Sequence, residues 1–405
     1  MPPALEDRPA SSVKDMTLEE LVEWCRSVGE RDPENRARQL WRWMYADVRM
    51  YGGETFIRGL EETYGRQNGF SEKFAHVMRE NGKTVGVPMT VTERHTAKDG
   101  TVKLVFTVTG GEMAGGRVET VLIPIPSRKG TRITVCVSSQ VGCAMNCQFC
   151  FTGRMGLKGN LTTGMIVEQL VEAKRHLAEH DSAFKVSDIK NIVFMGMGEP
   201  MDNLPAVTKA VRIMAHDQGL HISRGKITVS TVGLIPEMRQ YVADEPQTGL
   251  ALSLHATTDE TRDWIAPVNK RYPIADLVAT LEELFPHDMG CARQPLLVEY
   301  VMLRGVNDTP EDAVRLGELL RNVKCMVNLI VFNPHEGTLF EPSTPEAVEA
   351  FRAELKRQKY LCTVRDSRGD DEMAACGQLG AKEEAGKRLT AIPEWAKGKV
   401  RAPAA

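Results

Sequence analysis

Hydrophobic positions follow three successive patterns along the chain. From residue 15 to residue 88 they recur every three or four residues, which predicts a small helical accessory domain. Its first helix begins at the capping box Thr17-Leu-Glu-Glu, its second after Asp32 and its third after Ser71, because each of these residues is a good N-cap. Residues 1–14 lack such a pattern and are predicted to be disordered.

Residues 89–131 alternate between apolar and polar positions instead, which is typical of strands with one buried face. Two such runs flank Asp99-Gly100 and predict a β-hairpin. A further strand over Val118–Pro124 leads towards the next part of the chain. We therefore expect a β extension that links the helical domain to a larger domain.

From residue 132 to residue 380, apolar strands alternate with amphipathic helices, which predicts βα units around a parallel sheet. The predicted strands are Arg132–Ser138, Ile192–Met197, Lys226–Thr231, Leu250–His255, Leu296–Leu303, Asn328–Phe332 and a last strand Leu361–Val364. The predicted helices are Thr163–Ala178, Leu204–Ala215, Ile274–Leu284, Pro310–Leu320 and Pro345–Gln358. The expected fold class is α/β, with a partial (β/α)6 barrel that is open on one side. Residues 381–405 form a tail that we expect to fray from Lys397 onward.

The composition is that of a globular protein, with 42% hydrophobic and 26% charged residues. No apolar run reaches the ~18–20 residues of a membrane helix, so we expect no membrane association. Nine cysteines without an export signal favour metal or catalytic chemistry in a reducing compartment, which predicts a cytoplasmic protein. The net charge of −3 gives no sign of nucleic-acid binding, which would need a local basic surface. Nothing in the pattern demands more than a monomer.

Three of the cysteines form one motif, Cys143-Ala-Met-Asn-Cys147-Gln-Phe-Cys150. Three thiolates on a short loop suit three irons of a [4Fe-4S] cluster and leave the fourth iron open to a ligand. The spacing leaves three alternatives: a structural zinc site, which uses four ligands, a disulfide, which uses two thiols, and a set of core thiols.

Polar residues and glycines gather where the predicted strands end. They occur in Met195-Gly-Met-Gly-Glu-Pro, at Ser230, in Ser253-Leu-His255 and in Asn333-Pro334. In a parallel barrel these ends share one face, where the loops build the active site. Each has an ordinary structural explanation when taken alone, such as a turn or a cap. Together they indicate a ligand site that faces the cysteine loop.

These motifs resemble those of the RlmN/Cfr family of radical S-adenosylmethionine (SAM) adenosine methyltransferases, over about residues 35–380. The resemblance also rests on Arg117-Val-Glu-Thr-Val, Cys136-Val-Ser-Ser-Gln-Val-Gly-Cys, Arg368-Gly-Asp-Asp and Ala375-Cys-Gly-Gln-Leu. It implies a radical SAM barrel with a [4Fe-4S] cluster on Cys143, Cys147 and Cys150. It also implies SAM contacts at Gly198, Glu199, Ser230, Ser253, Leu254, His255 and Asn333.

The same resemblance assigns three catalytic residues. Cys376, on a C-terminal methyl-carrier loop, matches the cysteine that one SAM first methylates. Cys136 matches the cysteine that later forms a transient disulfide with it, and Glu119 matches the proton acceptor. Without the resemblance, Cys136 would be interpreted as a buried core thiol and Cys376 as a free surface thiol.

The implied reaction uses two SAM molecules per turnover. One methylates Cys376, and the second, cleaved at the open iron, yields a 5′-deoxyadenosyl radical that takes hydrogen from the S-methyl group. The methylene radical then adds to carbon 2 of adenine, an electron-poor carbon that does not attack SAM by ordinary displacement. Attack of Cys136 on the Cys376 sulfur frees 2-methyladenosine, and a reductant such as flavodoxin or ferredoxin supplies electrons.

The implied substrates are an adenosine of 23S rRNA and the adenosine 3′ of the anticodon in tRNA. One group of basic residues has two interpretations that are equally good. They could contact RNA phosphates, or they could simply form a solvated charged face: Arg36, Arg38, Arg42, Arg58, Arg128 and Lys129. The segment Ile125–Ile133 is longer than in the family pattern, which bears on RNA fit. The alternative functions are Cfr-type methylation at carbon 8 and a non-catalytic iron-sulfur RNA-binding protein or redox sensor. A sensor would not need Glu119, Cys136 or Cys376.

Overall fold

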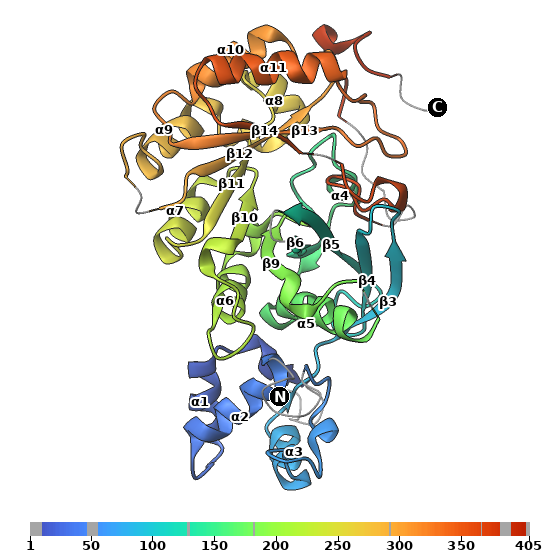
Figure 1. Ribbon diagram of the computed structural model, residues 1–405, viewed down its shortest axis with the longest axis vertical. Helices are drawn as coiled ribbons and strands as arrows, with labels where there is room; N and C mark the ends of the chain where they lie inside the picture. Colours follow the sequence, from blue (N-terminus) through green and yellow to red (C-terminus); the bar gives the residue numbers. More distant parts are fainter. Residues whose placement is uncertain are drawn as a thin grey trace, which may run out of the picture.

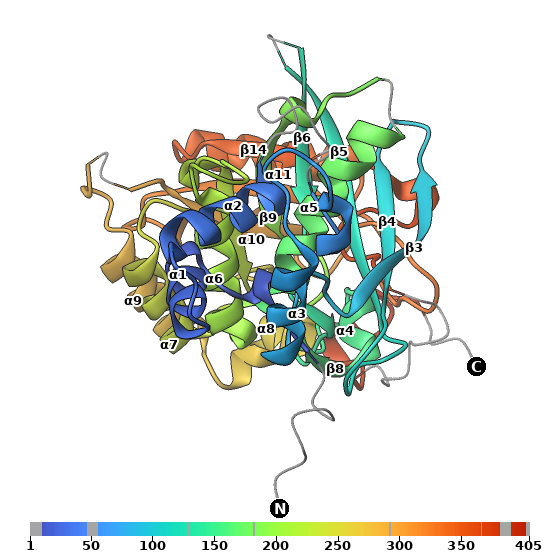
Figure 2. The same cartoon turned by 90° about the horizontal axis from the view of Figure 1, so that it is seen from below.

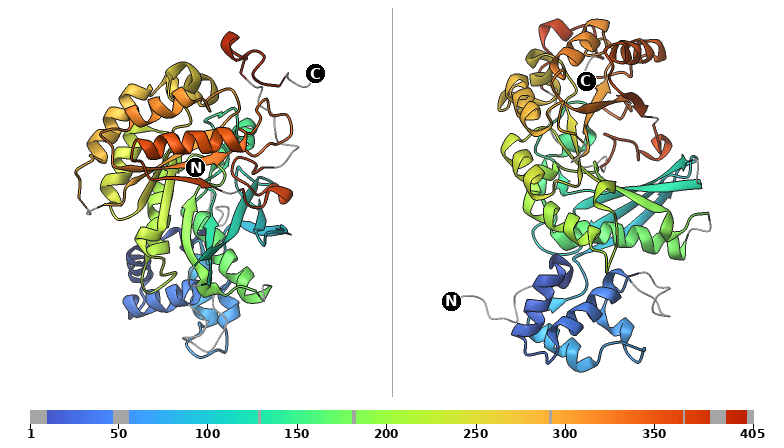
Figure 3. Two further views of the ribbon diagram at one scale, coloured as in Figure 1. Left: turned by 45° about the horizontal axis from the view of Figure 1, so that its top comes forward. Right: turned by 60° about the vertical axis from the view of Figure 1, so that its left-hand side comes forward.

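The computed structural model describes residues 10–46, 56–127, 130–180, 183–290, 293–365, 367–380 and 390–401. A small helical domain lies at one end of the molecule, and a large open barrel lies above it (Figure 1). A view from the side shows the helical domain below the rest of the molecule (Figure 3, right). Within the described residues, no helix is both long and apolar enough to span a bilayer.

Ten strands form one sheet in the order β14-β13-β12-β11-β10-β9-β6-β5-β4-β3. The strands from β6 to β14 are parallel and form the open barrel, which confirms the predicted fold class. Strands β3 to β5 continue the sheet in antiparallel fashion, as the predicted hairpin requires. The bounds are β3 Met89–Thr96, β4 Val102–Val108, β5 Arg117–Ser127, β6 Gly130–Cys136, β9 Ile189–Phe194, β10 Ile227–Thr231, β11 Gly249–Ser253, β12 Leu296–Met302, β13 Cys325–Val331 and β14 Cys362–Arg365.

Helices cover the outside of the barrel between successive parallel strands (Figure 1). Their bounds are α4 Phe151–Met155, α5 Thr163–Glu179, α6 Leu204–Ala215, α7 Ile235–Asp244, α8 Asp259–Ile265, α9 Ile274–Leu284, α10 Pro310–Leu319 and α11 Pro345–Arg357. The sequence pattern did not reveal α7, because only Met238, Tyr241 and Val242 of this short helix are buried. Two short strands, β7 Gln140–Gly142 and β8 Leu157–Asn160, pair across the cysteine loop.

The helical domain contains α1 Leu18–Ser27, α2 Pro33–Tyr45 and α3 Glu72–Glu80. Thr17 forms the expected capping box, and the side chains of Asp32 and Ser71 cap the other two helices. The domain packs against the barrel helices α5 and α6 (Figure 2). One continuous hydrophobic core runs through both parts. The two parts are therefore parts of a single folded unit.

Residues near both ends of the chain are more ordered than the sequence indicates. The predicted disorder is wrong for residues 11–14, because β1 Ser11–Ser12 pairs with β2 Lys83–Thr84 and Lys14 is fully buried. Fraying from Lys397 is also wrong for residues 397–401, since the Arg401 N–H donates to the Leu339 carbonyl at 2.8 Å. These segments gain order from distant parts of the chain, which no local pattern encodes. Residues 1–9 and 381–389 lie outside the described residues.

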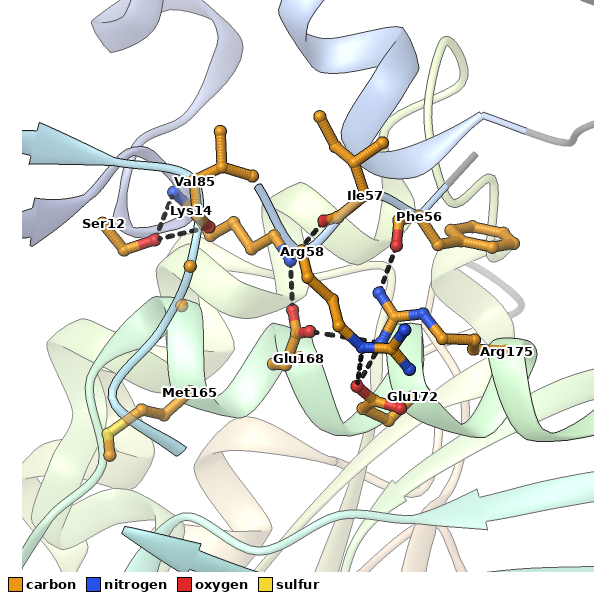
Figure 4. A network of polar contacts seen from close by, with 12 residues as sticks. Ser12, Lys14, Phe56, Ile57, Arg58, Val85, Met165, Glu168, Glu172 and Arg175 are labelled. Atoms are coloured by element: carbon orange, nitrogen blue, oxygen red, sulfur yellow. Dashed lines mark hydrogen bonds and ion pairs between the residues drawn. The ribbon is translucent and has the colours of Figure 1, made fainter. Parts of the chain in front are cut away.

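Buried charged residues join the helical domain to α5 (Figure 4). The fully buried Lys14 ammonium bonds to the Glu168 carboxylate. Arg175 Nη1 lies 3.7 Å from Glu168 and also bonds to Glu172, which Arg58 approaches at 3.6 Å. Burial of these charges is tolerated because each has a partner of opposite sign.

Replacing Lys14 with methionine is expected to lower the free energy of unfolding by about 3 kcal/mol, because the Glu168 carboxylate stays buried after its partner is lost. Urea denaturation measures this loss. Lys209 is a matched control, since it also joins the two parts through a pair with Glu20 at 2.8 Å, but both side chains are more than one-third exposed. Lys209→Met should cost less than about 1 kcal/mol. Equal losses in the two variants would contradict the role assigned to burial.

Candidate active site

The cysteine loop lies between β7 and β8 and ends at Cys150, the N-cap of α4. Main-chain hydrogen bonds fix its shape: the Cys143 N–H donates to Gly156 at 3.0 Å and the Cys150 N–H donates to Cys147 at 3.1 Å. The side chains of Cys143, Cys147 and Cys150 line one cavity of about 140 Å³, which we call the cofactor cavity. None of the three forms a disulfide.

This donor set fits a [4Fe-4S] cluster better than a single ion. Among the described residues, no three His, Cys, Asp or Glu side chains converge closely enough to hold one metal ion. Zinc requires such convergence, whereas each iron of a cluster takes one thiolate. Three thiolates are one ligand short of a structural zinc site, whereas they suit three irons of a cluster.

Glu199 lies in the same cavity, after β9. Its Oε1 accepts from the Met201 N–H at 3.1 Å and its Oε2 from the Val232 N–H at 2.9 Å. Burial raises the pKa of the carboxyl to about 7 despite these bonds. An ammonium group placed here would favour the ionised carboxylate, as expected of a site for the amino group of SAM.

Gly198 is required by the close packing beside Glu199. Its φ is +100°, and a Cβ at this position would lie 2.6 Å from Cβ of Gln140. The Gln140 side chain in turn accepts from the Glu199 N–H at 2.8 Å. The glycine thus allows the turn that aims Glu199 into the cavity.

His255 enters the cavity from the end of β11 as a neutral imidazole. Its Nδ1 accepts from the Val301 N–H at 3.1 Å, so Nε2 carries the ring proton. Burial, with a contribution from the nearby Arg262, lowers the pKa of His255 to about 3. The residue has φ +62°, an uncommon left-handed conformation that places the ring edge-on to Phe149 at 4.8 Å between ring centroids. It can donate one hydrogen bond to an oxygen of a bound ligand.

Three of the other predicted cofactor contacts also line the cavity, and one does not. Ser230, Ser253 and Asn333 lie on its wall. Leu254 is fully buried in the hydrophobic core, away from the cavity lining. Its N–H donates to the Glu299 carbonyl, and its own carbonyl accepts from Arg262. The predicted contact between Leu254 and SAM stays a prediction.

Arg262, which sequence reasoning missed, supports this wall from α8. Its fully buried guanidinium donates to the carbonyls of Leu254 at 2.9 Å and Val232 at 2.7 Å, just beyond β11 and β10. Burial lowers its pKa to about 10. An arginine in a short helix gives no sequence signal for such a role.

Cys376 reaches the cofactor cavity from the segment Met373–Gly380, which we call the carrier loop. The Phe151 N–H donates to the Gly377 carbonyl at 2.8 Å, and Asn333 Nδ2 donates to the Cys376 carbonyl at 3.2 Å. The loop is thereby bonded to the helix that follows the cysteine motif and to the end of the barrel. The structure brings Cys376 together with the predicted cofactor residues.

A second cavity, of about 450 Å³, adjoins the first and shares Cys376 and Leu379 of the carrier loop with it; we call it the substrate cavity. Cys136 lines it at the end of β6, and Cys376 lines both cavities. The long β5–β6 hairpin contributes Ile125 and Arg132 to its wall. Part of the longer segment noted in the sequence therefore borders this cavity.

Two charged residues that sequence reasoning passed over lie at the junction of the cavities. Glu299 on β12 and Arg365 at the end of β14 line both. Burial raises the pKa of the Cys136 thiol to about 12 and also raises that of Cys376, while the Arg365 guanidinium opposes both shifts. Glu299 could have been noticed as a carboxylate in an otherwise apolar strand.

Glu119 lies on β5, beneath the carrier loop. It is 2% exposed, and its Oε2 accepts from the Gly380 N–H at 3.3 Å. Burial raises the pKa of this carboxyl, and the Lys103 ammonium, 3.9 Å away, opposes the shift. Glu119 is not part of either cavity lining in this arrangement of the loop.

The basic residues considered for RNA binding differ in their surroundings. Arg36 is paired with Glu30 at 2.9 Å, and Arg58 belongs to the network at α5. Arg38 and Arg42 are exposed on α2. Arg128 and Lys129 lie outside the described residues.

Comparison with known proteins finds a matching family profile and relatives that align over nearly the whole chain. A family profile described as Radical SAM superfamily matches residues 137–317. The "Dual-specificity RNA methyltransferase RlmN" of Syntrophobacter fumaroxidans is 40% identical over 371 residues, which cover 91% of this chain and 98% of that protein. The protein of the same description from Phenylobacterium zucineum is 41% identical over 386 residues, with coverages of 94% and 93%.

A solved structure extends the similarity to three dimensions. A radical SAM methyltransferase from Sphaerobacter thermophilus is 37% identical, has a TM-score of 0.78, and matches over 91% of this chain and 98% of its own. Identity at this level over nearly the whole length includes the helical domain and the β extension as well as the barrel. The chain belongs to the RlmN family of radical SAM RNA methyltransferases.

Proposed function

We propose that this protein methylates carbon 2 of an adenosine in 23S rRNA, and of the adenosine 3′ of the anticodon in tRNA, through an S-methyl group on Cys376. Family membership implies a [4Fe-4S] cluster, SAM and an RNA substrate. The observation that carries the finer proposal is the position of Cys376, which lines both the cofactor cavity and the substrate cavity. One thiol can thus receive a methyl group on one side and pass it on at the other.

In the cofactor cavity, Cys143, Cys147 and Cys150 hold the cluster. Glu199 accepts from the amino group of SAM, and neutral His255 donates from Nε2 to one of its oxygens. When bound, the cluster and two SAM molecules per turnover supply the methyl group and a 5′-deoxyadenosyl radical. The walls of the cavity keep the Cys376 sulfur at the reacting end of SAM and exclude water.

Arg365 supports the thiol chemistry. A buried thiol is a poor nucleophile because its pKa is raised, and methyl transfer needs the Cys376 thiolate. The Arg365 guanidinium opposes that rise for Cys376 and Cys136 alike. It can therefore serve the methylation of Cys376 first and the attack by Cys136 later.

The substrate cavity receives the target adenine, flipped out of its RNA. Its apolar side chains from β5 and β9 offer contact surface to the base, and Arg132, Asn191 and Arg368 are polar groups on the same wall. After the Cys376 methylene carbon has bonded to carbon 2, Glu119 takes the ring proton. Cys136 then attacks the Cys376 sulfur, a disulfide forms as the carbon–sulfur bond breaks, and the freed methylene carbon takes up a proton to become the methyl group of the released nucleoside. The unpaired electron left by the radical addition would pass to the oxidised cluster held by Cys143, Cys147 and Cys150.

Nucleoside mass spectrometry tests the proposal. 23S rRNA and tRNA are incubated with the anaerobically reconstituted protein, SAM and a reductant, for which flavodoxin or ferredoxin is the physiological class. We expect 2-methyladenosine in both RNAs. Appearance of 8-methyladenosine would instead assign Cfr-type methylation at carbon 8 to the protein. Absence of any methyladenosine despite an intact cluster would favour the iron-sulfur sensor. Gel filtration of the reconstituted protein should give a monomer.

Cys147→Ala is expected to lose the visible absorbance of the cluster and all RNA methylation, because two thiolates cannot hold three irons. Absorbance near 400 nm after reconstitution, together with iron content, measures the loss. Cys362→Ala is the matched control, since Cys362 is a buried free thiol on β14 outside both cavity linings. A normal cluster in Cys147→Ala would refute the assigned ligand set.

A further inference from the structure

Lys103 lies where the β extension meets the carrier loop. It is on β4, opposite Val121 of β5, so its side chain is diagonal to that of Glu119 on the same face of the sheet. Its ammonium is 3.9 Å from Glu119 Oε2 and donates to the Met373 carbonyl at 3.4 Å. Lys103 is 8% exposed, an unusual burial for a lysine.

The other charged groups around Glu119 have additional partners. Arg117 on β5 pairs with Glu93 at 2.9 Å, and His95 on β3 lies 3.0 Å from the same carboxylate and 3.5 Å from Glu372. Within the described residues, Glu119 is the carboxylate that the structure pairs with Lys103. Lys103 also exerts the largest opposing effect on the burial-raised pKa of Glu119, ahead of Arg117 and His95.

We infer that Lys103 is a positioning residue for the proposed proton transfer, because its ammonium keeps Glu119 a carboxylate and fastens the first residue of the carrier loop. The inference rests on the proposed function, in which Glu119 accepts the proton of carbon 2. In that step the C2–H bond of the Cys376–adenine adduct breaks, its electron pair stays in the ring, and the proton passes to a Glu119 oxygen. Only an ionised Glu119 can accept it.

Removing the Lys103 ammonium changes the pKa of Glu119 in a definite direction. Burial already favours the neutral acid, so loss of Lys103 raises the pKa of Glu119 further. A smaller fraction of the enzyme then carries the carboxylate at neutral pH. The adduct should persist at low pH and resolve only when the pH is raised.

The test follows the covalent RNA–protein adduct during a single turnover, on denaturing gels, over a pH range of about 6 to 9. In Lys103→Met, the acid limb of the adduct-decay profile is expected to move up by about one pH unit or more. Lys103→Arg should keep the wild-type profile, because it retains the charge. Lys98→Gln, at an exposed lysine in the turn of the same hairpin, should also keep it.

Separate readouts keep the outcomes distinct. Mass spectrometry of S-methyl Cys376 reports whether the carrier loop still reaches the cofactor cavity; if Lys103→Met lacks this group, Lys103→Gln takes its place. An unchanged pH profile in the charge-removing variant would overturn the inference. The Glu119→Gln variant distinguishes failure of this inference from failure of the proposed function. Normal adduct decay in Glu119→Gln would show that Glu119 is not the proton acceptor. Slow decay in Glu119→Gln together with an unshifted pH profile in Lys103→Met would refute only the role of Lys103.

Discussion

Cys376→Ala should lower RNA methylation by a factor of at least about 10⁴, because no other residue in the proposal carries the methyl group. The cysteine lines both cavities, and an alanine there has no atom that can be methylated. Cluster assembly should be unchanged, since Cys143, Cys147 and Cys150 remain. Quantifying 2-methyladenosine after reaction, alongside the iron content of the same sample, measures both effects.

Cys325→Ala provides the matched comparison. Cys325 is a partly buried free thiol at the start of β13, outside both cavity linings. Its loss should leave methylation close to the wild-type level. Persistent methylation in Cys376→Ala would show that the methyl group reaches RNA without this carrier, and the proposed mechanism would fail.

Cys136→Ala should accumulate RNA that is covalently attached to Cys376, because nothing then attacks the Cys376 sulfur to free the product. Steady-state release of 2-methyladenosine is expected to fall by a factor of about 10³ or more. The first step is preserved, so mass spectrometry should find S-methyl Cys376 before RNA is added. A denaturing gel with labelled RNA detects the attached species.

A double variant completes this second experiment. Cys136→Ala combined with Cys376→Ala should form no attached RNA, because the attachment site is gone. Free product at the normal rate from Cys136→Ala alone would mean that another group opens the carbon–sulfur bond. Attachment in the double variant would place the linkage on a residue other than Cys376.

Much of the framework could be predicted from local sequence patterns. The N-caps at Thr17, Asp32 and Ser71 and the hairpin at Asp99-Gly100 are short-range signals, and the structure confirms all four. The parallel order of the barrel strands follows from the regular alternation of strands and helices. Most of the predicted cofactor residues at strand ends line one cavity because this topology sets their position in the barrel.

The remainder depends on contacts between distant residues. The order of residues 11–14 comes from a lysine that meets Glu168 far along the chain, and the support that Arg262 gives to the carbonyl of Leu254 comes from a separate helix. The tautomer of His255 is fixed by a main-chain group of the neighbouring strand β12. Arg365 looks ordinary in sequence because only the folded barrel brings it beside Cys376. The catalytic roles of Glu119, Cys136 and Cys376 stay predictions.

The hydrophobic core that runs unbroken from the helical domain into the barrel has a mechanical consequence. A helical domain that shares its core with the barrel cannot close over an RNA by a hinge motion without disrupting that core. In the proposed reaction, the deformation therefore occurs in the nucleic acid, whose adenine leaves its stack to enter the substrate cavity. RNAs whose target base is already loosely stacked should be modified fastest, so the shape of the RNA, as much as its sequence, would select the substrate.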